Sequence, residues 1–215
     1  MKIKLVPAIN AKNFDEIKER LNLLKKLTNH FHLDIATIEA TNYETWHNAS
    51  ELKKLPRELI IDLHLMTYLK PNDIFKWNDE VIKRFIIHPE YCYNIFSVLK
   101  QIKRFRKEIY LAWSPNIEFD FLERYLNYVN GLLVLGVNPG KSGQEFIEDT
   151  YKKLEFINKI RNYKKIKLMV DGGINKNNVI KIISYNPNFI IIASSIYSSE
   201  RPDKSYIEFK NLLLK

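Results

Sequence analysis

Histidine and aspartate recur at the ends of short apolar runs, where these residue types can bind a metal ion or move protons. His32 and Asp34 lie in one such run, His64 ends a second, and Asp171 ends a third much later in the chain. Residues two apart on a strand point the same way, so His32 and Asp34 should share one face. Two imidazoles and two carboxylates form a complete ligand set for zinc, ferrous iron or manganese.

The elements that must position these residues alternate along the whole chain. Runs rich in branched residues are separated by segments with helical periodicity, a pattern typical of parallel strands covered by helices. About eight such units in 215 residues favour a single (β/α)8 (TIM) barrel domain over residues 1–215. We expect a long loop with a short helix from Thr37 to Pro56. The expected strands are Ile3–Ala8, Phe31–Ala36, Leu59–Leu65, Arg84–His88, Ile109–Trp113, Leu132–Val137, Ile166–Val170 and Phe189–Ala193.

In such a barrel the carboxyl ends of all strands meet at the face that bears the active site, so the four polar residues would converge. A structural interpretation competes, because a buried imidazole and carboxylate can satisfy each other. Asp62 either holds the His64 ring or is an interior charge nearer the bottom of the barrel. His88, which precedes Pro89, either lines the pocket or merely ends a strand.

Three glycine- or serine-containing turns follow the late strands and could bind a phosphate group. Glycine lets backbone N–H groups approach an anion, and a helix that starts beyond the turn adds a favourable dipole. Gly-rich turns are often only turns, but three at one face favour a phosphorylated substrate. The candidate phosphate-binding residues are Gly140, Lys141, Ser142, Gly143, Gln144, Gly172, Gly173, Ser194 and Ser195.

Composition narrows the class of protein. A net charge of +9 invites a nucleic-acid interpretation, but the lysines are scattered and no nucleic-acid-binding motif is present, so solvated helix faces explain them better. No run of about 20 apolar residues indicates a membrane helix, and the first residues lack a signal-peptide pattern. Cys92 is the single cysteine, which excludes an intramolecular disulfide. We therefore expect a soluble cytoplasmic protein that binds neither nucleic acid nor membrane.

Six motifs along almost the whole chain resemble those of the ribulose-phosphate 3-epimerase family, in the same order and spacing. They are Pro7-Ala8-Ile9, His32-Leu33-Asp34, His64-Leu65-Met66, Ile87-His88-Pro89-Glu90, Pro139-Gly140 with Gly143-Gln144-Glu145-Phe146, and Val170-Asp171-Gly172-Gly173-Ile174. The resemblance implies a (β/α)8 barrel, a phosphorylated ketose substrate, a homo-oligomer and one divalent metal ion (zinc, ferrous iron, manganese or cobalt).

By the same resemblance, His32, Asp34, His64 and Asp171 correspond to the metal ligands, and Asp34 and Asp171 also to the two acid/base carboxylates. Inverting C3 of ribulose 5-phosphate to give xylulose 5-phosphate requires a base on each face of the carbon, and a metal can stabilise the enediolate between the two proton transfers. Met66 either caps the reacting carbons or packs in the core.

The sequence departs from the family pattern around the expected substrate site. Ala8 replaces a serine, Ala36 and Thr37 begin a changed segment after the second strand, and Leu135 replaces a methionine. Lys141 either contacts phosphate or is a solvated loop lysine, and Ser194 stands where glycine is expected. Three interpretations stay open: a ribulose-phosphate 3-epimerase, a 3-epimerase of a related ketose phosphate such as allulose 6-phosphate, or a catalytically weak barrel that binds a sugar phosphate or a protein.

Overall fold

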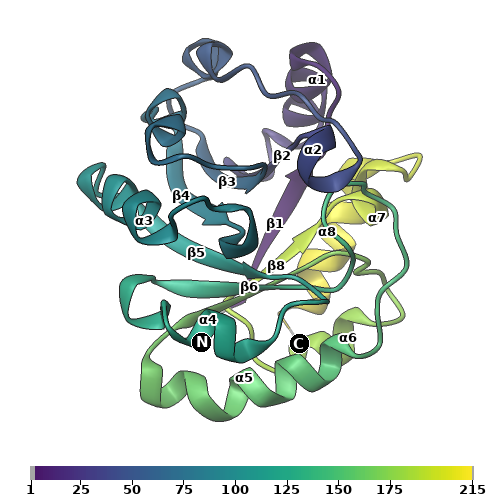
Figure 1. The fold of residues 1–215 in the computed structure, drawn as a ribbon. Coiled ribbons are helices and arrows are strands. Elements are labelled where there is room, and N and C mark those ends of the chain that lie inside the picture. The colour runs from purple at the N-terminus through teal and green to yellow at the C-terminus, as the bar shows by residue number, and fades with distance from the viewer. Residues whose placement is uncertain (1–2, 215) are drawn as a thin grey trace.

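The computed structural model describes residues 3–214, without the side chains of residues 161–164. Eight parallel strands close into a barrel in which each strand pairs with the next along the chain and the last pairs with the first (Figure 1). The predicted (β/α)8 barrel is therefore confirmed. The strands are β1 Lys4–Ile9, β2 His30–Ala36, β3 Ile60–Met66, β4 Ile82–Ile87, β5 Glu108–Trp113, β6 Gly131–Leu135, β7 Lys167–Asp171 and β8 Phe189–Ile192.

Helices surround the barrel and cover the outer face of the sheet (Figure 1). The α-helices are α1 Phe14–Leu24, α2 Ile38–Thr41, α3 Ile95–Arg104, α4 Phe119–Glu123, α5 Thr150–Lys164, α6 Val179–Ile183, α7 Ser194–Tyr197 and α8 Pro202–Leu212. Short 3-10 helices complete the connections: η1 Ala49–Lys54, η2 Pro71–Trp77, η3 Pro89–Tyr91 and η4 Leu126–Tyr128. None of the helices in the described part of the chain is long and apolar enough to cross a membrane.

Two connections show how the sequence pattern and the structure compare. The segment from Thr37 to Pro56 is a long connection as predicted, but it contains two short helices, α2 and η1, where one was expected. The crossover after β3 is instead the 3-10 helix η2, where a regular helix was expected. Pro71 begins η2, and Asp73 accepts a hydrogen bond from the Lys70 N–H at 2.8 Å. At three residues per turn, this seven-residue helix ends after little more than two turns.

The strands bury side chains on both faces, as their nearly continuous apolar runs require. On β6, Leu132 and Val134 pack in the core between sheet and helices, whereas Leu133 and Leu135 pack in the core inside the barrel. Inward positions on β1, β6 and β8 are apolar in the same way, those on β2 and β3 are largely polar, and β4 contributes both Arg84 and Ile86. The interior is thus divided into an apolar side and a polar side.

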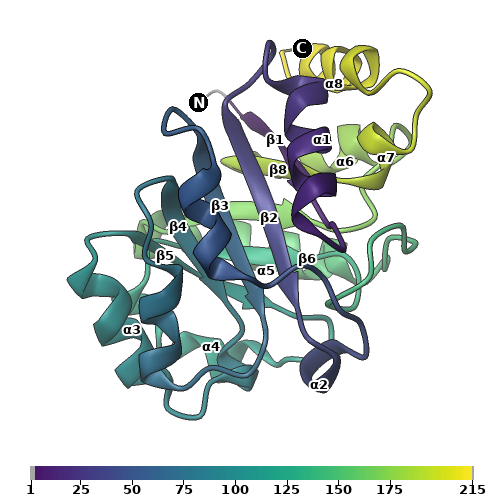
Figure 2. The same ribbon diagram turned by 90° about the horizontal axis from the view of Figure 1, so that it is seen from above.

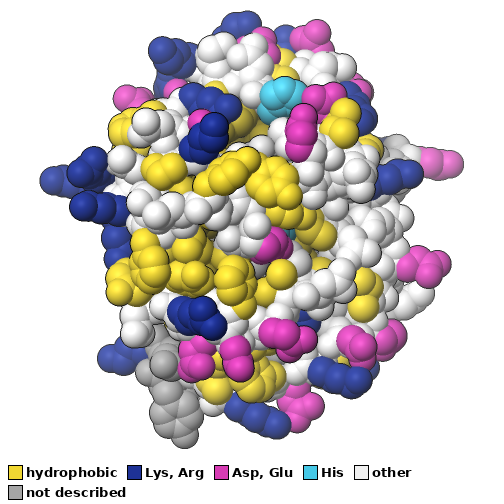
Figure 3. Space-filling view, in the orientation of Figure 1, with side chains coloured by type: hydrophobic (Ala, Val, Ile, Leu, Met, Phe, Trp, Pro, Cys, Tyr) yellow, Lys and Arg dark blue, Asp and Glu magenta, His cyan; other side chains and the backbone are white. Residues whose placement is uncertain are grey.

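The polar residues of β2 and β3 occupy two different levels of the barrel. In the register between these strands, His32 lies opposite Asp62, and Asp34 lies opposite His64. Figure 2 shows that α2, which follows the carboxyl end of β2, lies at the end of the barrel remote from the start of β1. Figure 3 views this carboxyl-end face, where hydrophobic side chains form a band across the middle, basic side chains gather along the left edge and several acidic ones lie below the band.

Candidate active site

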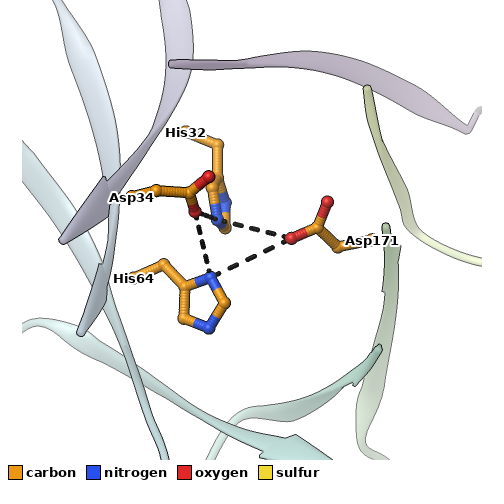
Figure 4. Close-up of side chains that lie close together, drawn as sticks. All are labelled: His32, Asp34, His64 and Asp171. Carbon is orange, nitrogen blue, oxygen red and sulfur yellow. Dashed lines mark hydrogen bonds and ion pairs between the residues drawn. The ribbon is translucent and has the colours of Figure 1, made fainter. Parts of the chain in front are cut away.

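The four predicted metal ligands converge at the carboxyl end of the barrel. His32 and Asp34 extend from β2, His64 from the neighbouring β3, and Asp171 from the last position of β7 on the other side (Figure 4). One ligand atom from each residue lies within 4.8 Å of those of the others. All four side chains are buried or nearly so, because the barrel wall surrounds them. In the described residues this is the one group of three or more such side chains arranged to hold an ion.

The distances between these groups fit a shared ion better than mutual pairing. The Asp34 Oδ1 atom lies 3.3 Å from His32 Nε2 and 3.2 Å from His64 Nδ1, and Asp171 Oδ2 lies 3.9 Å from each of these nitrogens. Ligands that are each about 2 Å from a common ion stand about 3–4 Å apart. Neither nitrogen of the buried His32 ring has a hydrogen-bond partner, so the residues present fit a divalent cation.

Burial and neighbouring charges push the two carboxyl groups apart in pKa. Burial raises the pKa of Asp171 to about 7, and the charge of Asp34 adds to this. Burial also opposes ionisation of Asp34, but the neighbouring imidazoles of His32 and His64 outweigh it and lower the Asp34 pKa. Burial likewise lowers the pKa of His64 to about 4. At neutral pH, Asp34 is ionised while Asp171 can hold a proton, which is the arrangement an acid/base pair needs.

Asn10 is a site residue that the sequence analysis missed. It follows β1 directly, and its Nδ2 donates hydrogen bonds to Asp34 Oδ2 at 3.2 Å and to the Gly140 carbonyl at 2.9 Å. One side chain therefore orients the carboxylate of Asp34 and ties it to the loop after β6. The signal was the position of a polar residue at a strand end, the same signal that singled out His64.

The sequence left two interpretations open for Asp62 and for His88, and the structure shows where each side chain lies. Asp62 does not reach the site: Arg84 Nη1 contacts both of its carboxylate oxygens at 2.7 Å, one register level below His64. It is the interior charge near the barrel bottom. His88 follows β4 and is fully buried, with its Nε2 at 2.9 Å from His64 Nε2. It therefore touches a candidate ligand behind the pocket wall.

The loops after β6, β7 and β8 form the rest of the pocket around Asp34, His64 and Asp171. Gly140 has φ +117° and its N–H donates to the sulfur of Met66 at 3.1 Å, so Met66 contacts this loop. The predicted residues that line the pocket are Met66, Gly140, Lys141, Ser142, Gly143, Gln144, Gly172, Gly173 and Ser194.

Some expected phosphate-binding features are differently placed. Ser195 is not among the lining residues, because its hydroxyl donates to the Ile174 carbonyl at 2.7 Å. The Gln144 amide donates to the Asn138 and Lys141 carbonyls, so it shapes its own loop. Of the three helices expected to start at these turns, α7 does so, whereas α5 and α6 begin several residues beyond them.

The chain is similar in sequence to proteins of known name over most of its length. A family model described as the ribulose-phosphate 3 epimerase family matches residues 4–197. Ribulose-phosphate 3-epimerase of Buchnera aphidicola subsp. Baizongia pistaciae is 28% identical over 220 residues, which cover 99% of this chain and 96% of that protein. The protein of the same name from Aquifex aeolicus is 26% identical over 174 residues, covering 80% of this chain and 77% of its own.

Solved structures with the same fold are more distant in sequence. 3-Hexulose-6-phosphate synthase from Salmonella typhimurium superposes with a TM-score of 0.76 at 14% identity, covering 100% of this chain and 99% of its own. KGPDC from Streptococcus mutans gives a TM-score of 0.76 at 11% identity and covers 100% of this chain and 98% of its own. These likenesses support the barrel, and the family model spans all eight of its strands. The chain belongs to the ribulose-phosphate 3-epimerase family.

Proposed function

We propose that this member of the family is a metal-dependent 3-epimerase that interconverts D-ribulose 5-phosphate and D-xylulose 5-phosphate. The observation that supports this most is the convergence of His32, Asp34, His64 and Asp171 on one buried gap, which the carboxyl groups of Asp34 and Asp171 face from different strands. Two carboxyl groups in opposite protonation states are what a two-base inversion requires at its start.

In the proposed reaction, the ionised Asp34 carboxylate removes the C3 proton from one face of the substrate. Asp171, on the other side of the mouth, delivers its proton to the opposite face, and the roles reverse in the other direction. A divalent cation held by His32, Asp34, His64 and Asp171 would polarise the C2 carbonyl and stabilise the negative charge of the enediolate. The Asn10 amide donates a hydrogen bond to Asp34, and this bond keeps the Asp34 carboxyl group oriented as Asp34 gains and loses a proton.

The identity of the metal and the route of phosphate binding are finer parts of the proposal. The ligand set suits zinc, ferrous iron, manganese or cobalt. We assign the phosphate group to the loops that contain Gly140–Gly143, Gly172–Gly173 and Ser194, with Lys141 as its cationic contact. The expected cytoplasmic location and homo-oligomeric state stay predictions.

A second candidate is a 3-epimerase of a longer ketose phosphate such as allulose 6-phosphate. Three of the positions that depart from the family pattern, Leu135, Lys141 and Ser194, line the pocket, whereas Ala8, Ala36 and Thr37 are not among its lining residues. The candidate metal ligands are retained, and the residues that differ line the pocket. This favours a change of substrate over a loss of epimerase activity.

Deuterium exchange tests these proposals together. The metal-loaded protein is incubated in deuterated water with ribulose 5-phosphate or with allulose 6-phosphate, and the C3 proton is followed by NMR. We expect rapid uptake of deuterium at C3 of ribulose 5-phosphate. Faster exchange with allulose 6-phosphate would support the second candidate, and no exchange with either would contradict both and leave a binding protein.

A further inference from the structure

A chain of buried hydrogen bonds continues from the back of the His64 ring away from the pocket. His64 Nε2 lies 2.9 Å from His88 Nε2, and the two rings are nearly parallel, with an interplanar angle of 8° and centroids 5.1 Å apart. His88 Nδ1 lies 3.0 Å from Glu90 Oε1 and 3.0 Å from the Ser114 hydroxyl, which itself donates to Glu90 Oε1. None of these three outer residues faces the pocket.

The carboxylate of Glu90 sets the order of donors and acceptors from the outer end of this chain. A neutral imidazole has one N–H donor and one acceptor nitrogen, and an ionised carboxylate only accepts. Because Glu90 Oε1 accepts from Ser114, the proton between it and His88 must reside on His88 Nδ1. His88 Nε2 is then an acceptor, so the proton between the rings belongs to His64 Nε2.

The opposite order would leave a buried repulsion. If His88 donated to His64, the bare Nδ1 of His88 would face the Glu90 carboxylate oxygen at 3.0 Å with no proton between them. Two buried acceptors that face each other without a donor are costly. The order set by Glu90 leaves one such contact at the inner end of the chain, where His64 Nδ1 lies 3.2 Å from Asp34 Oδ1, and a cation held there would relieve it. The carboxylate of Glu90 therefore selects the tautomer of His64 through His88.

The surrounding fold holds this chain in place. His88 and Glu90 flank Pro89 at the start of η3, directly after β4. Ser114 follows β5, and the ammonium of Lys153 on α5 donates to the carbonyls of Ser114 and Pro115 at 2.7 and 2.9 Å. The hydrogen-bond chain is thus anchored by two strand ends and one helix, all outside the pocket.

We propose that Glu90 and His88 are positioning residues that keep the His64 imidazole in the tautomer whose Nδ1 lone pair points at Asp34 and Asp171. This inference rests on the metal site proposed above, since it explains how His64 presents a lone pair to a cation. Histidine ligands commonly donate their second N–H to a carboxylate or a carbonyl, and such partners strengthen binding. Here the carboxylate acts through an intervening imidazole.

The first test needs no metal and no turnover. Nitrogen-15 NMR of the metal-free protein reports which nitrogen of each histidine ring is protonated, with the His64 signals assigned from a His64→Gln variant. We expect His64 to be protonated at Nε2 in the wild type. In Glu90→Gln the new amide can donate to His88 Nδ1, so His64 should shift toward the Nδ1-protonated form. A wild-type His64 protonated at Nδ1, or an unchanged tautomer in Glu90→Gln, would overturn the proposal.

The second test measures affinity for zinc and manganese by competition with a chelating dye. Glu90→Gln should weaken binding about 10–100-fold. Glu44→Gln is the matched control, because its carboxylate lies 3.8 Å from Nδ1 of the exposed His47 and should leave the affinity unchanged. Equal affinity in Glu90→Gln and the wild type would contradict the positioning role. A wild type that binds no divalent cation would instead contradict the proposed function, and the tautomer measurement tells the two failures apart.

Discussion

Two buried clusters of ionisable groups lie one above the other on the same strands, and only one of them satisfies its own charges. At the barrel bottom, Asp62 is 2.8 Å from His30 Nε2 and 2.7 Å from Arg84 Nη1. Arg84 also contacts Glu108 at 3.3 Å and stacks over the Phe189 ring. Every charge there has an opposite charge in contact, so the bottom cluster consists of structural ion pairs.

The mouth cluster of His32, Asp34, His64 and Asp171 uses the same residue types at longer distances. Its nitrogen–oxygen contacts range from 3.2 to 3.9 Å, and His32 has no hydrogen-bond partner. A buried group without a partner costs stability unless a ligand supplies the partner. The comparison teaches that completeness of pairing, more than residue type or burial, separates a structural cluster from a candidate reactive one.

Neutralising Asp34 should have the largest effect. Asp34→Asn keeps the shape of the side chain but cannot accept the C3 proton, so we expect deuterium exchange to fall about 10²–10⁴-fold. The folded structure should persist, as circular dichroism can verify. An unchanged exchange rate would remove Asp34 from the acid/base pair.

The equivalent change at the bottom should affect stability instead. Asp62→Asn leaves the buried Arg84 without its closest carboxylate, and breaking a buried ion pair costs about 3–5 kcal/mol in the free energy of unfolding. Denaturant unfolding measures the loss. Exchange per folded molecule should stay close to that of the wild type. If Asp62→Asn were stable but inactive, the bottom cluster would contribute to catalysis and not to stability, which would contradict the contrast between the two clusters.

Removing the metal should destabilise the protein through the mouth cluster alone. A cation at 100 times its dissociation constant stabilises the folded state by about 2.7 kcal/mol. For a chain of this size, the chelator should therefore lower the melting temperature by about 5–10 °C in a thermal scan. The same chelator should have little effect on Asp34→Asn. If the chelator lowered the melting temperature of Asp34→Asn as much as that of the wild type, the metal would bind outside the mouth cluster.

The smallest effect concerns the metal-free protein and depends on pH. Because burial raises the Asp171 pKa from 3.8 to about 7, its folded form holds a proton that the unfolded chain has lost. The group therefore reduces stability as pH rises from about 4 through 7. Metal-free Asp171→Asn should melt a few degrees above the wild type at pH 8, and the gain should shrink toward pH 4. The exposed Asp120→Asn is the control and should show no such dependence.

Much of the fold followed from local pattern, because buried parallel strands are continuous apolar runs. The alternation of such runs with helical periodicity predicted the closed barrel, and strand ends predicted the convergence of His32, Asp34, His64 and Asp171. The form of each crossover did not follow: the connection that starts at Pro71 is the 3-10 helix η2, where the pattern predicted a regular helix.

The parts of the site that could not be predicted depend on contacts across the fold. A period of two places Asp62 and His64 on one face but does not say at which level each finds a partner. Asn10 and Gly140 are 130 positions apart and meet only once the barrel closes. The same holds for His88 and Ser114, whose contact joins the ends of β4 and β5.

Metal analysis of the purified protein after dialysis tests the central claim most directly. The account predicts one divalent ion per chain in the wild type, the same ratio in folded Asp62→Asn, and loss of the ion in a variant that combines Asp34→Asn with Asp171→Asn. A wild type that retains no ion after reloading, or a double variant that keeps the ion, would contradict the assignment of the mouth cluster.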